Sequence, residues 1–107
     1  MATIALTRAE HGKSIKAQVG DLVTVSLDEN PTTGFRWTLD KSDEDVVAVL
    51  SSEYVVSPGS KLGKGGQRVV TFEVRQAGVS LIRLKLWRAW EGDSSITERF
   101  GVTLRAR

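Results

Sequence analysis

The sequence predicts an all-β protein folded as an antiparallel sandwich, and two patterns along the chain support this prediction. Apolar and polar residues alternate with a period of two along most of the chain, as they do in strands with one buried face. Turn signals such as Gly20-Asp21, Pro58-Gly59 and Gly92-Asp93 separate the alternating runs at short intervals. With 107 residues, the chain is expected to form a single domain that spans residues 1–107.

The expected strands follow from the alternation, taken in order along the chain. Short runs at 3–6, 15–19 and 53–56 are expected to be edge strands. Longer runs should supply the core, and their inward side chains are Val23, Val25 and Leu27; Phe35, Trp37 and Leu39; Val70, Phe72 and Val74; Ile82, Leu84 and Leu86; and Phe100, Val102 and Leu104. In the stretch 42–50, Ser42 and Asp45 resemble a capping box, but the β-branched valines favour a single turn that runs into a strand.

Composition excludes several classes of function. The chain has no cysteine, so a disulfide framework, a thiolate zinc site and a cysteine nucleophile are all excluded. The net charge is +2, and the basic residues look scattered among strand-like segments, which argues against a nucleic-acid partner. No run is long and apolar enough for a membrane span, so no membrane association is expected. The N-terminal residues lack the features of a secretory signal, and the compartment stays open.

Catalysis and metal binding are not expected. The single histidine, His11, has no serine or threonine motif that would place a nucleophile beside it. The acidic stretch 40–45 lacks the glycine and the terminal glutamate of an EF-hand calcium loop, and it is interpreted as a solvated turn. We therefore expect no catalytic residue, no metal ligand and no cofactor.

Residues 30–34, NPTTG, form the first of three unusual loops. Pro31 fixes its own φ and pushes Asn30 out of the helical region, while Gly34 can adopt a positive φ. The loop should therefore be stiff at both ends, with Thr32 and Thr33 at its tip. Considered alone, it is also consistent with an ordinary structural turn.

The other two loops lie at 60–68 and 86–92. Glycines at 63, 65 and 66 have no following helix, which argues against a phosphate-binding loop, but they would let a backbone lie flat against a partner. In the third loop, Arg88 and Trp90 are residue types enriched at interface hot spots, although an aromatic residue at a strand end can also cap a core. In a sandwich with immunoglobulin-like topology, the first and third loops emerge at the same end.

Three motifs in this order, NPTTGF at 30–35, GKGG at 63–66 and RAW at 88–90, resemble those of chagasin-like inhibitors of papain-family cysteine peptidases. The resemblance covers essentially the whole chain, including the ERFGVTL run near its end. It implies an all-β, immunoglobulin-like antiparallel β-sandwich that is not an enzyme. It also implies a reversible, tight-binding inhibitor, monomeric when free, whose three loops occlude the peptidase cleft.

The resemblance also implies which residues contact the peptidase. They are Asn30, Pro31, Thr32, Thr33, Gly34 and Phe35 in the first loop, Gly63, Lys64, Gly65 and Gly66 in the second, and Arg88, Ala89 and Trp90 in the third. Thr32 is expected to approach the catalytic Cys-His pair most closely, with Thr33 in support. Ala89 replaces the proline usual in the family, which puts the rigidity of the third loop in question, and Lys64 adds a charge where a small residue is common.

One other function remains open from the sequence. The three tryptophans would also suit an immunoglobulin-like module that binds a carbohydrate or another protein. Calorimetry against glycans and titration against a papain-like peptidase would separate the two functions.

Overall fold

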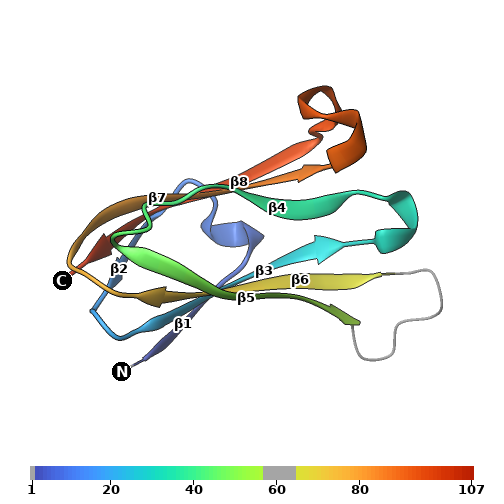
Figure 1. Cartoon of the computed structure of the whole chain (residues 1–107). Coiled ribbons are helices and arrows are strands. Elements are labelled where there is room, and N and C mark those ends of the chain that lie inside the picture. The colour runs from blue at the N-terminus through green and yellow to red at the C-terminus, as the bar shows by residue number, and fades with distance from the viewer. Residues whose placement is uncertain (1, 57–64) are drawn as a thin grey trace.

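The computed structural model describes residues 2–56 and 65–107, and it folds as a sandwich of two four-stranded sheets (Figure 1). The first sheet has the strand order β1 (Thr3–Leu6), β3 (Leu22–Glu29), β6 (Gly66–Val74) and β5 (Val47–Val56). The second has the order β2 (Ser14–Ala17), β8 (Glu98–Ala106), β7 (Gly78–Trp87) and β4 (Arg36–Lys41). The predicted immunoglobulin-like β-sandwich is confirmed.

Four short 3-10 turns lie in three of the connections between described strands. They are η1 (Arg8–Glu10), η2 (Pro31–Thr33), η3 (Ala89–Glu91) and η4 (Asp93–Ser95). Within 2–56 and 65–107, none of the helical segments has the length and apolar character needed to cross a membrane.

The edge strands differ from a purely antiparallel arrangement. β1 pairs with β3 in parallel, and β2 pairs with β8 in parallel, while the other pairs are antiparallel. The parallel pairing arises because the chain crosses from the first sheet to the second between β1 and β2, and then crosses back to form β3. Both short strands are edges, as predicted, and so is the longer β5.

The inward faces of the two sheets form one core. Nearly all of the side chains predicted to point inward are buried, and Leu39 and Leu86 pack against the core from partly buried positions. The prediction that the Phe35 side chain points into the core is wrong. Phe35 precedes β4 and stays partly exposed, because the turn at Gly34 delays the start of the strand to Arg36.

The turn before β5 runs into a strand, as predicted, but a different residue caps it. The Asp43 carboxylate accepts a hydrogen bond from the Asp45 amide at 3.0 Å, and the Asp43 carbonyl accepts from the Val46 and Val47 amides. The Asp43 amide in turn donates to the Ser80 hydroxyl at 2.9 Å. Asp43, and not the Ser42 that resembles a capping residue in the sequence, therefore caps the turn and anchors it to β7.

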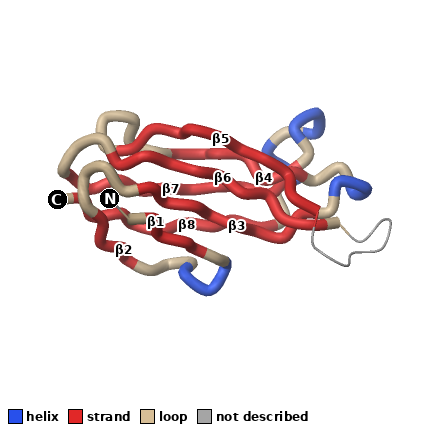
Figure 2. The backbone as a smooth tube through the Cα atoms, turned by 90° about the horizontal axis from the view of Figure 1, so that it is seen from below, coloured by secondary structure: helices blue, strands red, loops and turns tan. Residues whose placement is uncertain are grey.

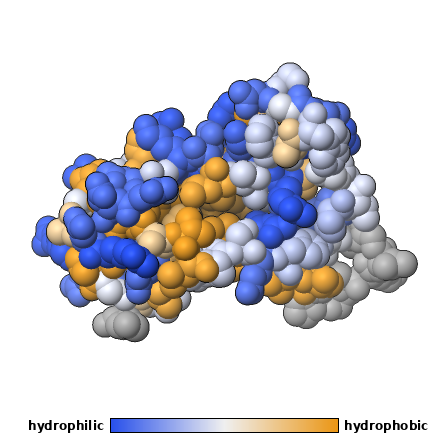
Figure 3. Space-filling view, viewed as in Figure 1, coloured by the Kyte–Doolittle hydropathy of each residue, from blue (hydrophilic) through white to orange (hydrophobic). Residues whose placement is uncertain are grey.

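The edge strand β5 exposes several apolar side chains. They are Val49, Leu50, Val55 and Val56. In the orientation of Figure 1, apolar side chains gather in the middle of the face turned to the viewer (Figure 3). A shift of register between Val49 and Ser51 marks a β-bulge, and Glu53 places a charge on the same strand. Bulges and charges on edge strands hinder pairing with a second copy, so both features act against aggregation at this edge.

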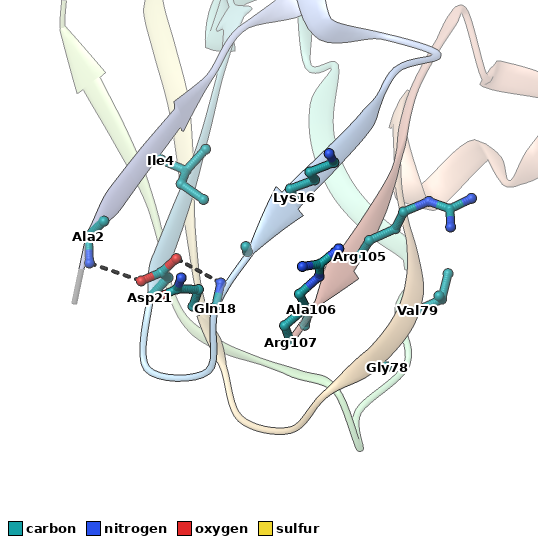
Figure 4. Close-up of a pocket in the computed structure, with 11 residues that line it drawn as sticks. Ala2, Ile4, Lys16, Gln18, Asp21, Gly78, Val79, Arg105, Ala106 and Arg107 are labelled. Carbon is teal, nitrogen blue, oxygen red and sulfur yellow. Dashed lines mark hydrogen bonds between the residues drawn. The ribbon is translucent and has the colours of Figure 1, made fainter.

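Both termini lie at one end of the sandwich, opposite the turns η2 and η3 (Figures 1 and 2). At the terminal end, the buried Asp21 carboxylate accepts hydrogen bonds from the Gln18 amide at 2.9 Å and from the Ala2 amide at 3.0 Å (Figure 4). These two donors, Gln18 foremost, hold the pKa of Asp21 below the ordinary value of 3.8. The carboxylate thus ties the first strand to the turn before β3.

This arrangement predicts an acid-dependent contribution to stability. Because folding lowers the pKa of Asp21, the stabilisation by its carboxylate is present above about pH 4. This stabilisation is lost as the pH falls through the pKa that Asp21 has in the folded protein. In Asp21→Asn, the melting temperature should therefore fall less between pH 7 and pH 3 than in the parent protein. The exposed substitution Asp45→Asn serves as control. Equal acid sensitivity in the parent and Asp21→Asn proteins would contradict the assignment.

Candidate functional site

The end of the sandwich away from the termini carries the predicted loops. The turn η2 connects β3 to β4, and the turns η3 and η4 connect β7 to β8. β5 ends and β6 begins at the same end, where Gly66 lies in register with Glu29 and Val56. Because η2, η3 and η4 all lie at this end, the first and third loops are neighbours, as the sequence predicted. Two predicted contacts of the second loop, Gly63 and Lys64, lie outside the described residues.

Internal hydrogen bonds shape the first loop. The side chain of Asn30 accepts from the Thr32 amide at 3.0 Å and from the Thr32 hydroxyl at 2.7 Å. The Thr33 hydroxyl donates to the Asn30 carbonyl at 2.7 Å and accepts from the Phe35 amide at 3.3 Å. Pro31 opens the 3-10 turn, and Gly34 ends it with a φ of 80°. The tip stays exposed while its own polar groups hold its shape, which agrees with the predicted stiffness.

Arg88 joins the third loop to the first. Its Nε and Nη2 atoms donate to the Thr33 carbonyl at 3.1 and 2.9 Å, and its Nη1 atom lies 3.3 Å from the Glu91 carboxylate. The guanidinium also stacks over the Phe35 ring, 4.4 Å from its centroid. The sequence suggested Arg88 as a contact to a partner. In the structure the Nε, Nη1 and Nη2 atoms each donate within the protein, so Arg88 holds the two loops together, and its contact with a partner stays a prediction.

Trp90 is the most exposed large apolar side chain of the described residues, at 73%. Its indole edge lies against Gly34, where a Cβ atom would come within 2.8 Å of Cη2. Both the positive φ and this contact therefore require glycine at position 34. Trp87 does not fill the alternative role of a core cap either, because it lies on the outward side of β7, partly buried, and donates to the Thr38 hydroxyl at 3.1 Å.

Side-chain contacts also hold the part of the third loop that lacks a proline. Ala89 is the first residue of η3, and Arg88 before it is extended, with φ −101° and ψ 110°. The Arg88 amide donates to the Ser95 hydroxyl at 3.0 Å, and that hydroxyl lies 2.6 Å from the Gly92 carbonyl. The rigidity that the sequence put in question is thus supplied by Arg88 and Ser95.

The described glycines of the second loop have structural roles. Gly65 has a φ of 75°, and a Cβ atom there would lie 2.7 Å from the Glu29 carbonyl oxygen. Gly66 is a buried residue of β6, and a Cβ atom there would clash with the Val55 carbonyl. Close approach of neighbouring strands therefore explains both glycines, and Gly66 offers little surface to a partner.

A buried carboxylate at the base of the first loop escaped the sequence analysis. The Glu29 side chain is 2% exposed and accepts a hydrogen bond from the Trp37 amide at 2.6 Å. It also accepts from Arg68, at 2.8 Å from Nη2 and 3.2 Å from Nε. A signal was present, because Glu29 continues the inward alternation of Val23, Val25 and Leu27.

The described residues contain no cluster of acidic or histidine side chains suited to a metal ion.

The buried pair predicts that the first loop depends on Glu29 for its stability. Glu29→Ala should lower the free energy of unfolding by about 3 kcal/mol, because it leaves the Arg68 guanidinium buried without its partner. Chemical denaturation would measure the loss. Glu53→Ala removes an exposed carboxylate from the neighbouring strand β5 and should change stability by less than about 0.5 kcal/mol. Equal losses in the two variants would mean that the Glu29–Arg68 pair has no special role.

Comparisons with known proteins agree with this geometry. The family description "Chagasin family peptidase inhibitor I42" matches residues 16–104. Chagasin of Trypanosoma cruzi is 33% identical over 105 residues, which cover 94% of this chain and 96% of chagasin. The cysteine protease inhibitor EhICP2 of Entamoeba histolytica matches with a TM-score of 0.88 and 21% identity, over 100% of this chain and 97% of its own. Leishmania mexicana ICP matches with a TM-score of 0.68 and 28% identity, over 91% and 90% of the two chains. This chain therefore belongs to the chagasin family of peptidase inhibitors.

Proposed function

We propose that this protein inhibits papain-like cysteine peptidases reversibly by placing the turn η2 in the active-site cleft, with the neighbouring loops against the cleft walls. One observation carries the proposal: Arg88 and Trp90 of the third loop brace Thr33 and Gly34 of the first, so the two loops form one surface. A preformed surface loses little conformational entropy on binding, which favours tight association. PbICP-C, whose fold matches with a TM-score of 0.70 at 13% identity over 100% of both chains, has been solved in complex with falcipain-2.

Thr32 would make the closest approach to the catalytic pair. It lies at the exposed tip of η2, and its hydroxyl already donates to the Asn30 side chain. The hydroxyl oxygen therefore presents acceptor lone pairs to a partner. A protonated catalytic histidine could donate to this oxygen, and the buried polar pair would then keep a hydrogen-bond partner.

The shape of the tip explains how the inhibitor would escape cleavage. Residues 31–33 form a 3-10 turn, and Gly34 follows in the left-handed region, so the tip is not an extended substrate strand. Attack by a thiolate requires the scissile carbonyl to lie in line at a distance of about 3–3.5 Å. A folded turn held by Asn30 and Thr33 does not offer a carbonyl in that geometry, and binding would be reversible.

The loops on the two sides of η2 would have different roles. Trp90 would supply most of the apolar contact on one side, since it is exposed and rests on the rigid turn at Gly34. Arg88 would act through Thr33 and Phe35, as a positioning residue. On the other side, Gly63 and Lys64 remain proposed contacts that lie outside the described residues, and Gly65 would set the course of the chain at their base.

The alternative function, a sugar-binding module built on tryptophans, has less support. Trp37 is 3% exposed and belongs to the core, and Trp87 is partly buried under the Lys85 side chain. Trp90 alone is widely exposed. The three tryptophans therefore do not form a shared stacking surface.

Titration against papain tests the proposal. The parent protein should inhibit papain stoichiometrically and stay intact on mass spectrometry. Trp90→Ala should weaken inhibition by about thirtyfold, equivalent to about 2 kcal/mol, because exposed tryptophans at interface centres commonly contribute this much. Its melting temperature should change by less than about 3 °C, since Trp90 lies outside the core.

Val19→Ala provides the matched control, because Val19 is also an exposed apolar residue but lies near the termini. It should leave inhibition unchanged. An absence of inhibition by the parent protein at tens of micromolar, or rapid cleavage between Thr32 and Gly34, would exclude the proposed function. A large loss of melting temperature with unchanged inhibition in Trp90→Ala would show that Trp90 is structural.

A further inference from the structure

The charges of this protein are divided between its two sheets. The strands of the second sheet carry seven basic residues (Lys16, Arg36, Lys41, Arg83, Lys85, Arg99 and Arg105) and two acidic residues (Asp40 and Glu98). The strands of the first sheet carry one basic residue (Arg68) and four acidic residues (Asp28, Glu29, Glu53 and Glu73). The interpretation of the basic residues as scattered is therefore wrong, because most of those on strands belong to one sheet.

Side chains alternate between the two faces along each strand, and this alternation places these cations on the outer face of the second sheet. Ile82 and Leu84 point into the core, so Arg83 and Lys85 between and beyond them point outward. The same holds for Arg99, Arg105 and Lys16, which are exposed next to buried neighbours on β8 and β2. We call this surface, formed by the outward basic residues of β2, β4, β7 and β8, the basic face.

The basic face contains three pairs of like charges in adjacent strands. Lys16 lies in register with Arg105, Lys41 with Arg83, and Lys85 with Arg99. Like charges directly opposite each other destabilise a sheet. A sequence that accumulates such pairs on one face departs from what stability favours, and departures of this kind are expected at functional surfaces.

Acidic side chains compensate only one of these pairs. Asp40 lies 3.4 Å from Lys85 and 3.5 Å from Arg99, and Asp93 lies 3.7 Å from Lys85. Among the described residues, Lys16, Lys41, Arg83 and Arg105 form no ion pair. Most of the basic face therefore lacks a counter-charge from within the protein.

We infer that the basic face binds an anionic polysaccharide, through the sulfate or carboxylate groups along the polymer. The argument is charge complementarity: cations from four adjacent strands lie in rows across the sheet, and a polymer with regularly spaced anions can neutralise several of them at once. Hydroxyls of Ser14, Thr38 and Thr103 belong to the same strands and alternate in step with these cations, where they can bond to sugar hydroxyls.

The shape and composition of the face favour a flexible polymer over other anionic partners. Twist of about 20–25° between neighbouring strands turns a four-stranded face away from a plane, so a flat bilayer would meet only part of the charge. Single-stranded nucleic acid needs exposed aromatic platforms for its bases. On this face, Trp87 is covered by Lys85, whose Nζ atom lies 3.7 Å from the ring centroid.

A pocket of about 700 Å³ marks the terminal end of the basic face (Figure 4). Lys16, Arg105 and Arg107 from β2 and the end of β8 contribute to its lining, across from Ile4 of β1. Its lining also includes the Asp21 carboxylate and the apolar side chains of Ile4 and Val79, so the cations at its rim would hold an anionic group, not the pocket itself. Lys16 and Arg105 lie near the termini, at the opposite end of the sandwich from η2, whereas Arg36 and Lys85 bring the basic face close to η2 and η4.

Binding to dextran sulfate, with unsulfated dextran as the neutral comparison, tests the inference. The protein should bind the sulfated polymer and not dextran. If about four cations take part, the affinity should fall by roughly fiftyfold between about 50 and about 200 mM salt. Arg83→Glu should weaken binding at least tenfold, because it removes a central cation and adds an anion.

The same variant separates this inference from a structural role of Arg83. Arg83→Glu turns the like-charge pair with Lys41 into an opposite-charge pair, so the melting temperature should rise by about 1–4 °C while polymer affinity falls. Inhibition of papain should not change. Arg75→Glu is the matched control, because it changes the net charge equally but lies just beyond β6, beside Glu73.

Three results would overturn the inference. They are equal losses of affinity in Arg83→Glu and Arg75→Glu, which would reduce the effect to net charge; binding to unsulfated dextran; and tighter binding to duplex DNA or to anionic vesicles than to dextran sulfate. Because papain inhibition is measured in parallel, failure here is distinguishable from failure of the inhibitory function.

Discussion

The ion pair between Glu29 and Arg68 is the constraint on which the proposed inhibitory end of this molecule depends. The pair is almost completely buried, and the same carboxylate accepts the Trp37 amide just after the first loop. It therefore ties the end of β3 to the start of β4 in the opposite sheet and to β6 beside it. Burying two charges costs desolvation energy, which their attraction offsets only when the geometry is good. The pair therefore fixes the position of the residues at the base of the first loop more than it raises the net free energy of unfolding.

From this base, the inhibitory surface is built by loops that hold one another. The first loop satisfies its own polar groups through Asn30 and Thr33, and Arg88 fastens the third loop to it through the Thr33 carbonyl. Trp90 remains widely exposed while the edge of its indole contacts Gly34. Like charges in register collect on the outer face of the second sheet, and this face reaches the same end at Arg36 and Lys85.

The sequence allowed the fold class, most core residues and the grouping of the first and third loops to be predicted, because period-two alternation and turn residues report local geometry directly. It did not reveal what long side chains do across loops. The role of Arg88 in holding the loops together could not be predicted, because its bond to Thr33 joins positions 55 residues apart. Glu29 was missed because a charge was not expected at an inward position. The parallel pairing of the edge strands was missed because alternation carries no information on strand direction. The basic face stayed hidden until register showed which cations are neighbours.

The central claim is that the free inhibitor already holds its loops in the binding geometry. Backbone ¹⁵N relaxation of the unbound protein tests this most directly, since it reports motion on the picosecond-to-nanosecond timescale. If the loops are preformed, the order parameters of Thr32, Thr33, Gly34 and Trp90 should lie near the value of about 0.85 that is typical of rigid backbone. Values below about 0.6 at these residues, with rigid strands on either side, would show that the loops are ordered only on binding and would contradict it.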